Sequence, residues 1–392
     1  MTPEEVELLS QLTIVIPTYN RPLELERSIE YWRDTPVTVH ILDGSDKPWF
    51  PVGVLPGAPK IMYHHIPSMF NENAMENYTR RMQFAPGLPT TKFSALCADE
   101  DFFSLSGLAI FCRRLSDGNL IEAVVGCALQ YSKDASSKIV WNLRYSWKQG
   151  AKSQSNNIVD RVLDQSREFY SYYAVTRTDS WKKVLSHSSE IKYSHIYFQE
   201  HLINIFMSAH CRIFVERHIC WIREFQRKTS EIYSGPRIRD ADWFRDKRNR
   251  SEIKFFENQL KKGISSAFGG NENLRVSRVL ARKQIRFIRK FSDTARFRRY
   301  KKSALRATNQ FFTFLPSQLK SKINSSLPTG VAISLGAVPQ TREKALHKPV
   351  FQLSYLLTEI SKTDITFVEE ELVDIEKLLL KPREELRLRA NI

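Results

Sequence analysis

Two short apolar runs joined by one amphipathic segment constrain most strongly what this chain can fold into. Residues 12–17 read Leu-Thr-Ile-Val-Ile-Pro and residues 37–42 read Val-Thr-Val-His-Ile-Leu, and both runs are rich in β-branched side chains. Runs of this kind are typical of strands that are buried on both faces of a parallel sheet. Residues 23–33 lie between them with helical periodicity, and their apolar face is formed by Leu25, Ile29 and Trp32. The pattern predicts a strand-helix-strand unit with a right-handed crossover.

The same alternation of strand and helix patterns continues to about residue 221. Further strands are predicted at residues 60–64, 93–98, 123–130 and 212–221, and further helices at residues 71–83, 106–115, 158–168 and 196–208. The polar stretch 132–157 predicts an irregular excursion or a hairpin. The expected fold class is therefore α/β, with a sheet flanked by helices.

Charge is distributed unevenly along the chain. Lysine and arginine number 59 against 43 for aspartate and glutamate, which gives a formal net charge of +16. Residues 1–110 hold 8 basic and 14 acidic side chains, so they carry −6 and residues 111–392 carry +22. A basic partner surface is therefore expected outside the N-terminal third.

Composition also divides the chain into four segments. A strongly basic stretch of helical pattern begins near residue 227, and a run of Gly, Pro and small residues follows near residue 330. The expected organisation is a catalytic domain at 1–228, a basic helical extension at 229–327, a linker at 328–341 and a C-terminal helical segment at 342–392.

Cysteine usage and the N-terminus bear on the compartment. The five cysteines are an odd number without a Cys-x-x-Cys pair, which supports neither a disulfide scaffold nor a zinc knuckle. Residues 1–11 are acidic and lack a signal-peptide pattern, and no run of 18 apolar residues occurs. We therefore expect a cytoplasmic protein, either free or peripheral on the inner face of the membrane.

Polar clusters follow three of the predicted strands. Thr18-Tyr19-Asn20 follows the first, Asp43-Gly44-Ser45 follows the second, and Asp99-Glu100-Asp101 follows the strand at 93–98. In an open parallel sheet, ligands bind beyond the carboxyl ends of the strands. Three such clusters at successive strand ends indicate a nucleotide-binding crevice.

At these residues the sequence resembles glycosyltransferase family 2, whose members are inverting enzymes with the GT-A fold. The likeness rests on Thr13-Ile-Val-Ile-Pro-Thr-Tyr-Asn-Arg-Pro22, on Ile41-Leu-Asp-Gly-Ser45 and on the acidic triplet, and it covers about residues 12–225, loosely after residue 110. The resemblance implies a GT-A-like (Rossmann-like) mixed sheet. It also implies transfer of a sugar from a nucleotide sugar, most simply a UDP-sugar, to a glycan or lipid-linked glycan acceptor, as in bacterial-type surface polysaccharide synthesis.

The resemblance also assigns residues to the donor. Thr18, Tyr19 and Asn20 would line the nucleotide pocket, and Asp43 would bond the base. Arg80 and Arg81 fall where relatives often carry a diphosphate contact, although they could equally be an exposed helix end. Many relatives have paired aspartates before the Gly-Ser, whereas here Leu42 precedes Asp43, which leaves the nucleobase open.

By the same resemblance Asp101 would hold a metal ion and Asp99 would approach the ribose and assist. A nucleotide-sugar leaving group carries about two negative charges, which a hard divalent cation stabilises as the sugar departs. Carboxylate oxygens suit Mg²⁺ or Mn²⁺, and one or two from the protein suffice because phosphate and water complete the shell. An acidic triplet can also be a solvated turn or a helix N-terminal cap, but that explanation fits less well directly after an apolar strand.

An inverting transfer needs a base that takes the proton of the acceptor hydroxyl. Relatives place an acidic residue at the start of a helix, and Glu200 occupies the equivalent position here. It could also be an ordinary helix-surface glutamate. Asp179 is the rival base, unless it caps the helix that begins at Ser180.

The stretch from Arg275 to Lys302 holds 12 basic residues and one acidic residue, Asp293, with apolar side chains interleaved. A basic amphipathic helix suits an anionic membrane surface, and nucleic acid would meet the same charge pattern. Alternatively its apolar face packs on the catalytic domain. The lipid-linked acceptor implied by the resemblance favours the membrane over nucleic acid. Two other functions stay open: a non-catalytic scaffold on a degenerate transferase fold, and a nucleic-acid-binding protein.

Overall fold

The computed structural model describes residues 1–72, 74–118, 120–133, 139–145, 153–165, 171–189, 196–224, 243, 246–269, 274–286, 357 and 365–381. Two units are distinguished, of which the first comprises Met1–Arg237, Arg250–Gln284 and Phe351–Ile392, and the second Ile238–Asn249 and Ile285–Val350. The sheet and the candidate site belong to the first unit. Within the described residues, no helix is both long and apolar enough to cross a membrane.

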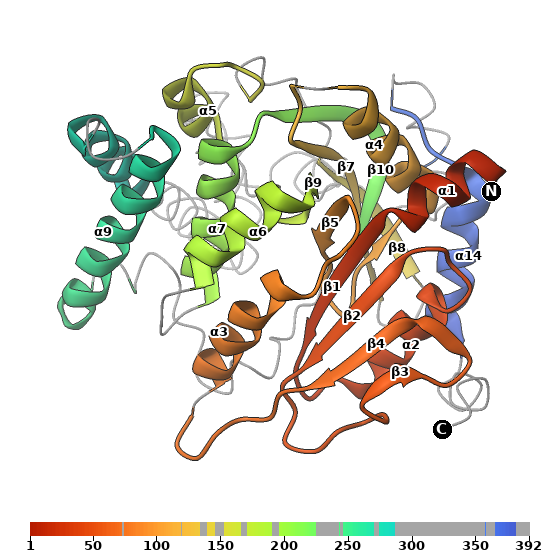
Figure 1. The fold of residues 1–392 in the computed structure, drawn as a ribbon. Helices are drawn as coiled ribbons and strands as arrows, with labels where there is room; N and C mark the ends of the chain where they lie inside the picture. Colours follow the sequence, from red (N-terminus) through yellow and green to blue (C-terminus); the bar gives the residue numbers. More distant parts are fainter. Residues whose placement is uncertain are drawn as a thin grey trace, which may run out of the picture. The chain divides into compact units, whose positions relative to one another are not determined.

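Ten strands form one mixed sheet (Figure 1). They are β1 (Leu12–Thr18), β2 (Thr38–Asp43), β3 (Gly53–Leu55), β4 (Ala58–His65), β5 (Phe93–Leu96), β6 (Phe102–Phe103), β7 (Ala123–Lys133), β8 (Ile139–Tyr145), β9 (Val175–Arg177) and β10 (Ile213–Glu224). The strand order is β3-β4-β2-β1-β5-β9-β7-β10-β6, and β8 pairs with β7 off this path.

Helices lie against both faces of this sheet (Figure 1). The helices of the structure are α1 (Pro3–Ser10), α2 (Pro22–Trp32), α3 (Ala74–Phe84), α4 (Leu105–Asp117), α5 (Ile158–Gln165), α6 (Thr178–Ser189), α7 (Ile196–His210), α9 (Arg250–Ala267) and α14 (Glu369–Leu380), and residues 274–286 are also helical. Of these, α5 and α9 pack on α7. The mixed sheet flanked by helices confirms the predicted α/β fold class.

The parallel half of the sheet positions the predicted crevice. β1 pairs in parallel with β2, where Thr18 lies opposite Asp43, and with β5, where Val15 lies opposite Leu96. β4 pairs in parallel with β2, so these four strands are parallel in the order β4-β2-β1-β5. From β1 the chain adds β2 and β4 on one side, and it then returns to add β5 on the other side of β1. That reversal is a topological switch point, at which open α/β sheets bind ligands.

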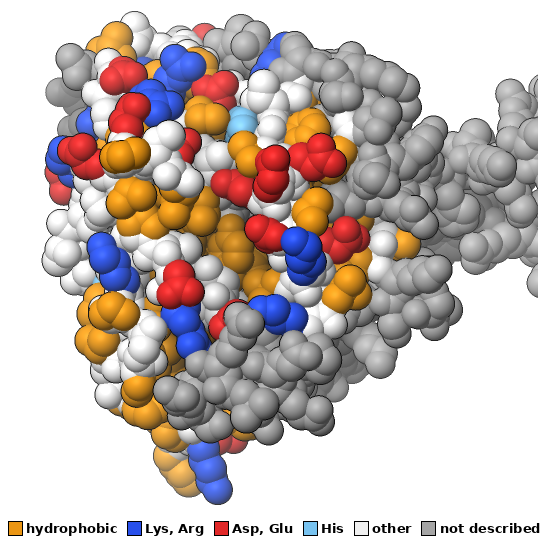
Figure 2. All heavy atoms as spheres, turned by 90° about the vertical axis from the view of Figure 1, so that its right-hand side faces the viewer, with side chains coloured by type: hydrophobic (Ala, Val, Ile, Leu, Met, Phe, Trp, Pro, Cys, Tyr) orange, Lys and Arg blue, Asp and Glu red, His pale blue; other side chains and the backbone are white. Residues whose placement is uncertain are grey.

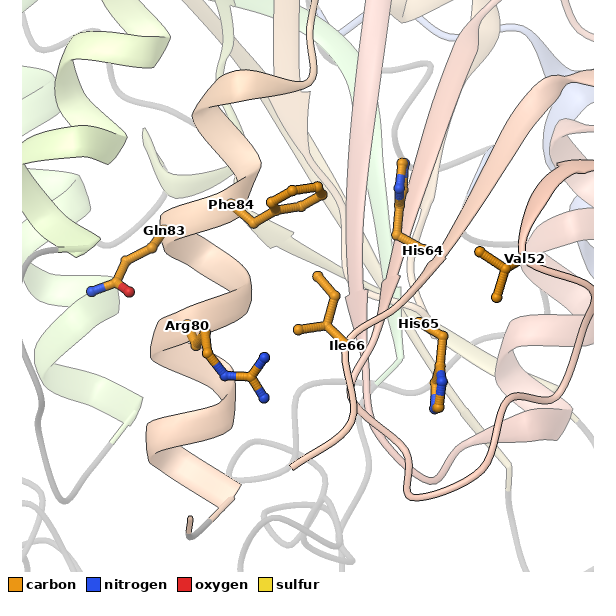
Figure 3. Close-up of a pocket in the computed structure, with 7 residues that line it drawn as sticks. All are labelled: Val52, His64, His65, Ile66, Arg80, Gln83 and Phe84. Carbon is orange, nitrogen blue, oxygen red and sulfur yellow. The ribbon is translucent and has the colours of Figure 1, made fainter. Parts of the chain in front are cut away.

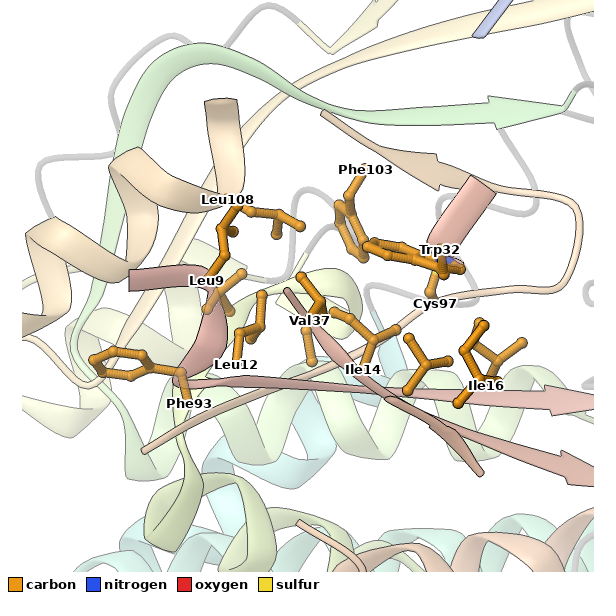
Figure 4. Packing of buried hydrophobic residues seen from close by; sticks show 14 of the residues in the cluster. Leu9, Leu12, Ile14, Ile16, Trp32, Val37, Phe93, Cys97, Phe103 and Leu108 are labelled. Carbon is orange, nitrogen blue, oxygen red and sulfur yellow. The ribbon is translucent and has the colours of Figure 1, made fainter. Parts of the chain in front are cut away.

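The apolar strand residues form the core with one helical layer. Leu12, Ile14 and Ile16 of β1 are fully buried against α1, α2 and α4. Figure 4 shows Trp32 of α2 next to Phe103 and Cys97 in this cluster. The β-branched runs form central strands because they can be buried on both faces, which is the property that their sequence predicts.

Several elements differ from the sequence prediction. Residues 3–10 form a helix because Thr2 and Glu5 make a capping box at its start. By contrast, β8 within the polar stretch 132–157 pairs antiparallel with β7, which agrees with the hairpin alternative predicted there. β9, only three residues long, inserts antiparallel between β5 and β7. Such short strands leave no periodic signal, and their pairing comes from the neighbours.

Two segments from beyond residue 228 pack within the sheet unit. α9 contacts α7, and α14 contacts α2. Of the stretch from Arg275 to Lys302, residues 275–286 are helical, while the remainder, the predicted linker and most of the segment 342–392 lie outside the described residues. The predicted four-part division stays a prediction.

Candidate functional site

The loops after β1 and β2 are bonded to each other at the strand ends. The backbone N–H of Gly44 donates to the Thr18 carbonyl at 3.0 Å, and the backbone N–H of Asn20 donates to Ser45 Oγ at 2.9 Å. Asn20 has a left-handed backbone with φ of 54°, a conformation that asparagine tolerates better than most residues. Thr18, Tyr19, Asn20 and Asp43 are therefore brought together, as their places in the sequence predict.

Asp43 is fully buried and its carboxylate is satisfied within the protein. Its Oδ1 accepts hydrogen bonds from Ser45 N at 2.8 Å and Ser45 Oγ at 2.5 Å, and its Oδ2 accepts one from the Tyr63 hydroxyl. Burial and the bond to Asp43 raise the pKa of Tyr63. This carboxylate fixes the loop after β2, and a base could bond it only if Tyr63 or Ser45 moved.

Arg80 and Arg81, neighbours in α3, do different things. Arg81 is 1% exposed, and its Nη1 donates to the carbonyls of Thr18 and Leu42, which joins the ends of β1 and β2. Burial lowers the pKa of Arg81 to about 10. Its Nε and Nη2 have no hydrogen-bond partner among the described residues. Arg80 is nearer the surface, where it forms an ion pair with Glu72 at 2.8 Å.

The acidic loop, residues 99–101, follows β5 across the switch point. Asp99 is 4% exposed; its Oδ2 accepts from Thr18 Oγ1 at 2.7 Å and its Oδ1 from Arg21 Nη1 at 2.8 Å. Arg21 also forms an ion pair with Glu100. Burial raises the pKa of Asp99, although Arg21 and Thr18 oppose that shift. The hydrogen bond between Thr18 and Asp99 joins the carboxyl ends of β1 and β5.

Asp101 is bonded to β10, a contact that sequence reasoning missed. Its Oδ2 accepts from Trp221 Nε1 at 2.9 Å and its Oδ1 from Glu224 N at 3.1 Å. Burial raises the pKa of Asp101 to about 6, against the opposing charge of Arg223. No local signal in the sequence joins residues 120 positions apart, so only the pairing of β10 with β6 and β7 reveals this contact.

Asp99 and Asp101 have the chemistry of ligands for a hard divalent cation. Among the described residues, no group of three or more His, Cys, Asp or Glu side chains is placed to hold a metal. A Mg²⁺ or Mn²⁺ ion that takes its other ligands from phosphate and water needs only one or two protein oxygens. Burial disfavours the charge of both carboxylates, so an added cation would stabilise them. Arg21 would compete with that ion at Asp99.

Of the two candidate bases, Glu200 shares an aromatic neighbour, Tyr173, with Asp101. Tyr173 stacks on Trp221 with ring centroids 4.0 Å apart. Burial raises the pKa of Tyr173, and the charges of Asp101 and Glu200 raise it further, so both acids lie within electrostatic reach of this ring. Glu200 lies in the first turns of α7 and is half-buried.

Asp179 lies at the opposite end of the strands from the acidic loop. It is exposed at the start of α6, directly after β9. β9 runs antiparallel to β5, with Arg177 opposite Phe93, so Asp179 lies past the amino end of β5. Residues 99–101 follow the carboxyl end of that strand.

A cavity of about 580 Å³ adjoins the loop after β2 (Figure 3). The cavity is lined by the end of β4, by α3 and by the residue before β3. The lining residues are Val52, His64, His65, Ile66, Arg80, Gln83 and Phe84. His65 Nε2 lies 2.8 Å from the Ser45 carbonyl, which joins the cavity wall to the Asp43 loop. His64 pairs with His40 at 2.9 Å, and burial lowers the pKa of His40 to about 4.

Comparison with known proteins gives distant structural matches. No family model matches the chain, and no curated protein matches it. Among solved structures, S. aureus TarS 1-349 matches with 9% identity and a TM-score of 0.38, over 68% of this chain and 73% of that chain. S. aureus TarS 1-349 in complex with UDP-GlcNAc matches with 11% identity and a TM-score of 0.37, over 68% and 74%. At these scores the likeness assigns neither a family nor an activity to this chain.

Proposed function

We propose that this protein is a metal-dependent inverting glycosyltransferase that uses a nucleotide-sugar donor. One observation carries the proposal: Thr18 and Asp99, at the ends of β1 and β5, hydrogen-bond across the topological switch point. The polar loop after β2 is bonded to the same place through Gly44. Polar groups converging at a switch point are the arrangement expected for a nucleotide site.

The donor site consists of the three strand-end loops. Thr18, Tyr19 and Asn20 would face the nucleoside, and Asp43 would shape the base pocket through Ser45 and Tyr63. Arg80, which lines the adjoining cavity, would face the diphosphate, and Arg81 would hold the strand ends together. The resemblance to family 2 makes a UDP-sugar the first donor to test.

Asp101 and Asp99 would hold Mg²⁺ or Mn²⁺. The ion, when bound, would neutralise charge on the diphosphate. For the transfer, Glu200 would accept the proton of the acceptor hydroxyl. The hydroxyl oxygen would attack the anomeric carbon from the side opposite the diphosphate. The bond from that carbon to the phosphate oxygen would break, and the nucleoside diphosphate would leave with the electron pair.

The acceptor would be a glycan or lipid-linked glycan at an anionic membrane, in bacterial-type surface polysaccharide synthesis. The helix at 274–286 supports this location. Its buried side chains are Ser277, Leu280, Ala281, Gln284 and Ile285. Leu274, Val276 and Val279 remain 37–49% exposed among Arg275, Arg278, Arg282 and Lys283. A packed helix that still presents aliphatic and cationic side chains outward suits an anionic lipid surface.

A non-catalytic scaffold on a degenerate transferase fold is the second candidate function. The burial of Asp43, whose carboxylate has no exposed surface, favours it. A scaffold would not need Asp101 for any nucleotide binding. A nucleic-acid-binding protein would instead show steeply salt-dependent affinity for nucleic acid.

Hydrolysis of a panel of UDP-sugars and other nucleotide sugars, with Mn²⁺, Mg²⁺ or a chelator, tests the proposal. The full chain should hydrolyse at least one donor with metal, and Asp101→Asn should lose both turnover and metal-dependent nucleotide binding. Unchanged activity of Asp101→Asn at saturating Mn²⁺ would overturn the metal assignment. Hydrolysis of no donor, together with no nucleotide binding, would favour the scaffold.

The pair Glu200→Gln and Asp179→Asn identifies the base. Glu200→Gln should bind the donor like wild type and lose transfer by about 10²- to 10⁴-fold, the range of general base catalysis. The Asp179→Asn variant should transfer at the wild-type rate, because Asp179 lies past the amino end of β5, away from the acidic loop. Transfer is measured with the donor found in the panel, and the opposite pattern would make Asp179 the base.

A further inference from the structure

A segment near the C-terminus joins the edge of the sheet beside the acidic loop. Residues 365–381, here called the C-terminal strap, begin with a parallel bridge in which Thr366 lies beside His218 of β10. Thr366 N donates to the Arg217 carbonyl at 2.8 Å, and Ile219 N donates to the Thr366 carbonyl at 2.9 Å. The side chains of His218 and Thr366 are also hydrogen-bonded, at 2.7 Å.

The helix of the strap then places Glu371 at the start of α4. The Glu371 carboxylate accepts from Ser104 Oγ at 2.5 Å, from Ser106 N at 2.8 Å and from Ser106 Oγ at 2.9 Å. Ser104 is already the N-cap of α4, since its Oγ accepts from Gly107 N. A carboxylate at a helix N-terminus is favourable because it meets unpaired N–H groups and the positive end of the helix dipole.

The rest of α14 fastens the strap to two more elements. Its inward side chains are buried, namely Leu372, Ile375, Leu378 and Leu379. Glu376 accepts from Trp141 Nε1 of β8 at 3.0 Å, and Lys381 forms an ion pair with Glu30 of α2 at 3.2 Å. On the face of the molecule that carries α14, acidic and basic side chains lie interspersed (Figure 2).

Two of the strap's attachments, at Thr366 and at Glu371, are made to segments that adjoin Asp101. β10 is bonded to the strap at Ile219. A few residues further along the same strand, Trp221 and Glu224 donate hydrogen bonds to the Asp101 carboxylate. On the other side, Ser104 follows Asp101 by three residues, and its N–H donates to the Cys220 carbonyl at 2.8 Å. The strap is therefore bonded to the two segments that fix the place of Asp101.

We propose that the C-terminal strap is a positioning element that holds β10 and the start of α4 so that Asp101 stays at the strand ends. Glu371 is its positioning residue, because three hydrogen bonds of one carboxylate reach the chain directly after the acidic loop. The effect on ligand affinity rests on the proposed function, in which Asp101 belongs to the donor site. The effect on the surroundings of Asp101 does not.

The test compares Glu371→Ala and Glu371→Gln in the full chain with a control on the same helix, Asp374→Ala. Asp374 pairs only with Lys377 in the described structure, and both side chains are about 70% exposed (73% and 69%). The reporter is the indole N–H resonance of Trp221, which donates to Asp101 and is assigned with Trp221→Phe. Affinity for UDP with Mn²⁺ and the melting temperature are measured in parallel.

Glu371→Ala should shift the Trp221 resonance and weaken UDP binding by about tenfold, as expected when a charge-assisted hydrogen bond is lost. Glu371→Gln should show smaller changes in the same direction, and Asp374→Ala should match wild type in both. Should Glu371→Ala fail to fold, the isosteric glutamine variant provides the test. A lower melting temperature with an unshifted Trp221 resonance and unchanged UDP affinity would overturn the proposal and leave α14 a packing element only. If the wild type binds no UDP, the donor proposal fails, while the Trp221 resonance still tests the strap.

Discussion

At Gly44 the loop after β2 lies against side chains of α3. A Cβ atom at this position would lie 2.1 Å from Asn77 Oδ1 and 2.7 Å from Arg81 Nε. Both neighbours are buried side chains, so neither can move into solvent without loss of packing. The glycine therefore permits the contact between the loop after β2 and the arginine that holds β1 and β2 together.

Gly44→Ala should destabilise the fold by about 1–3 kcal/mol, the usual cost of overpacking. It should also weaken nucleotide binding, since Arg81 must shift from the Thr18 and Leu42 carbonyls. Urea unfolding and nucleotide titration measure the two effects. Gly87→Ala is the matched control, because no atom lies within 4 Å of its Cβ position. Equal stability of the two variants would contradict the close contact at Gly44.

At the scale of one element, the helix at 274–286 shows how a basic stretch can pack on the protein and still bind a partner. Its buried side includes Gln284, whose Nε2 donates to the Val162 carbonyl of α5 at 2.6 Å. Its outward side keeps the cations and three aliphatic side chains in solvent. Packing and membrane contact are therefore compatible, because they use opposite sides of the helix.

The outward side of this helix should bind anionic vesicles in a salt-dependent way. The change tested is Arg275→Glu, Arg278→Glu and Lys283→Glu together, which reverses three exposed cations. Each cation near an anionic surface contributes about 1 kcal/mol, so vesicle affinity should fall by about a hundredfold or more. Co-sedimentation measures it, with Lys60→Glu, Lys92→Glu and Lys377→Glu as a charge-matched control. Equal pelleting of the two triple variants would rule out this helix as the membrane contact.

For the molecule as a whole, three histidines with lowered pKa values contribute to its response to acid. Burial lowers the pKa of His40, His210 and His218 to about 4 in each case. They lie in different places: on β2, at the contact of α7 with Gly263 of α9, and beside the strap. Each is held neutral in the fold, whereas the unfolded chain takes up a proton near the ordinary value of 6.5.

The contribution of these histidines to the free energy of unfolding should therefore be fully present above pH 6.5. It should fall as the pH drops from 6.5 towards 4. The sign follows because the three histidines give the unfolded state more protons over this range, and Asp101, whose pKa is raised to about 6 in the fold, offsets only part of that difference. Urea unfolding at several pH values between 7.5 and 4.5 measures the slope. His218→Gln should have a shallower slope, since it removes one histidine that is neutral in the fold and protonated in the unfolded chain. A slope of zero between pH 6.5 and 4.5 in the wild type would show that the histidines are not held neutral.

Local patterns in the sequence determined the central strands, most of the helices and the strand-end clusters. The runs at 12–17 and 37–42 became β1 and β2 within one residue at each end, because a continuous β-branched run is stable only when buried on both faces. The clusters at residues 18–20, 43–45 and 99–101 met at one edge because parallel strands share their carboxyl ends.

Tertiary structure alone decided what each polar side chain does. Tyr63 hydrogen-bonds to Asp43, and Trp221 hydrogen-bonds to Asp101. Glu371 accepts a hydrogen bond at the start of α4, from more than 260 positions away in the sequence. Arg80 and Arg81 look alike in the sequence, yet one reaches the surface and the other is buried under the strand ends. Pairings of this kind have no local signature, because they arise when distant segments bury polar groups that must then be satisfied by whatever packs beside them.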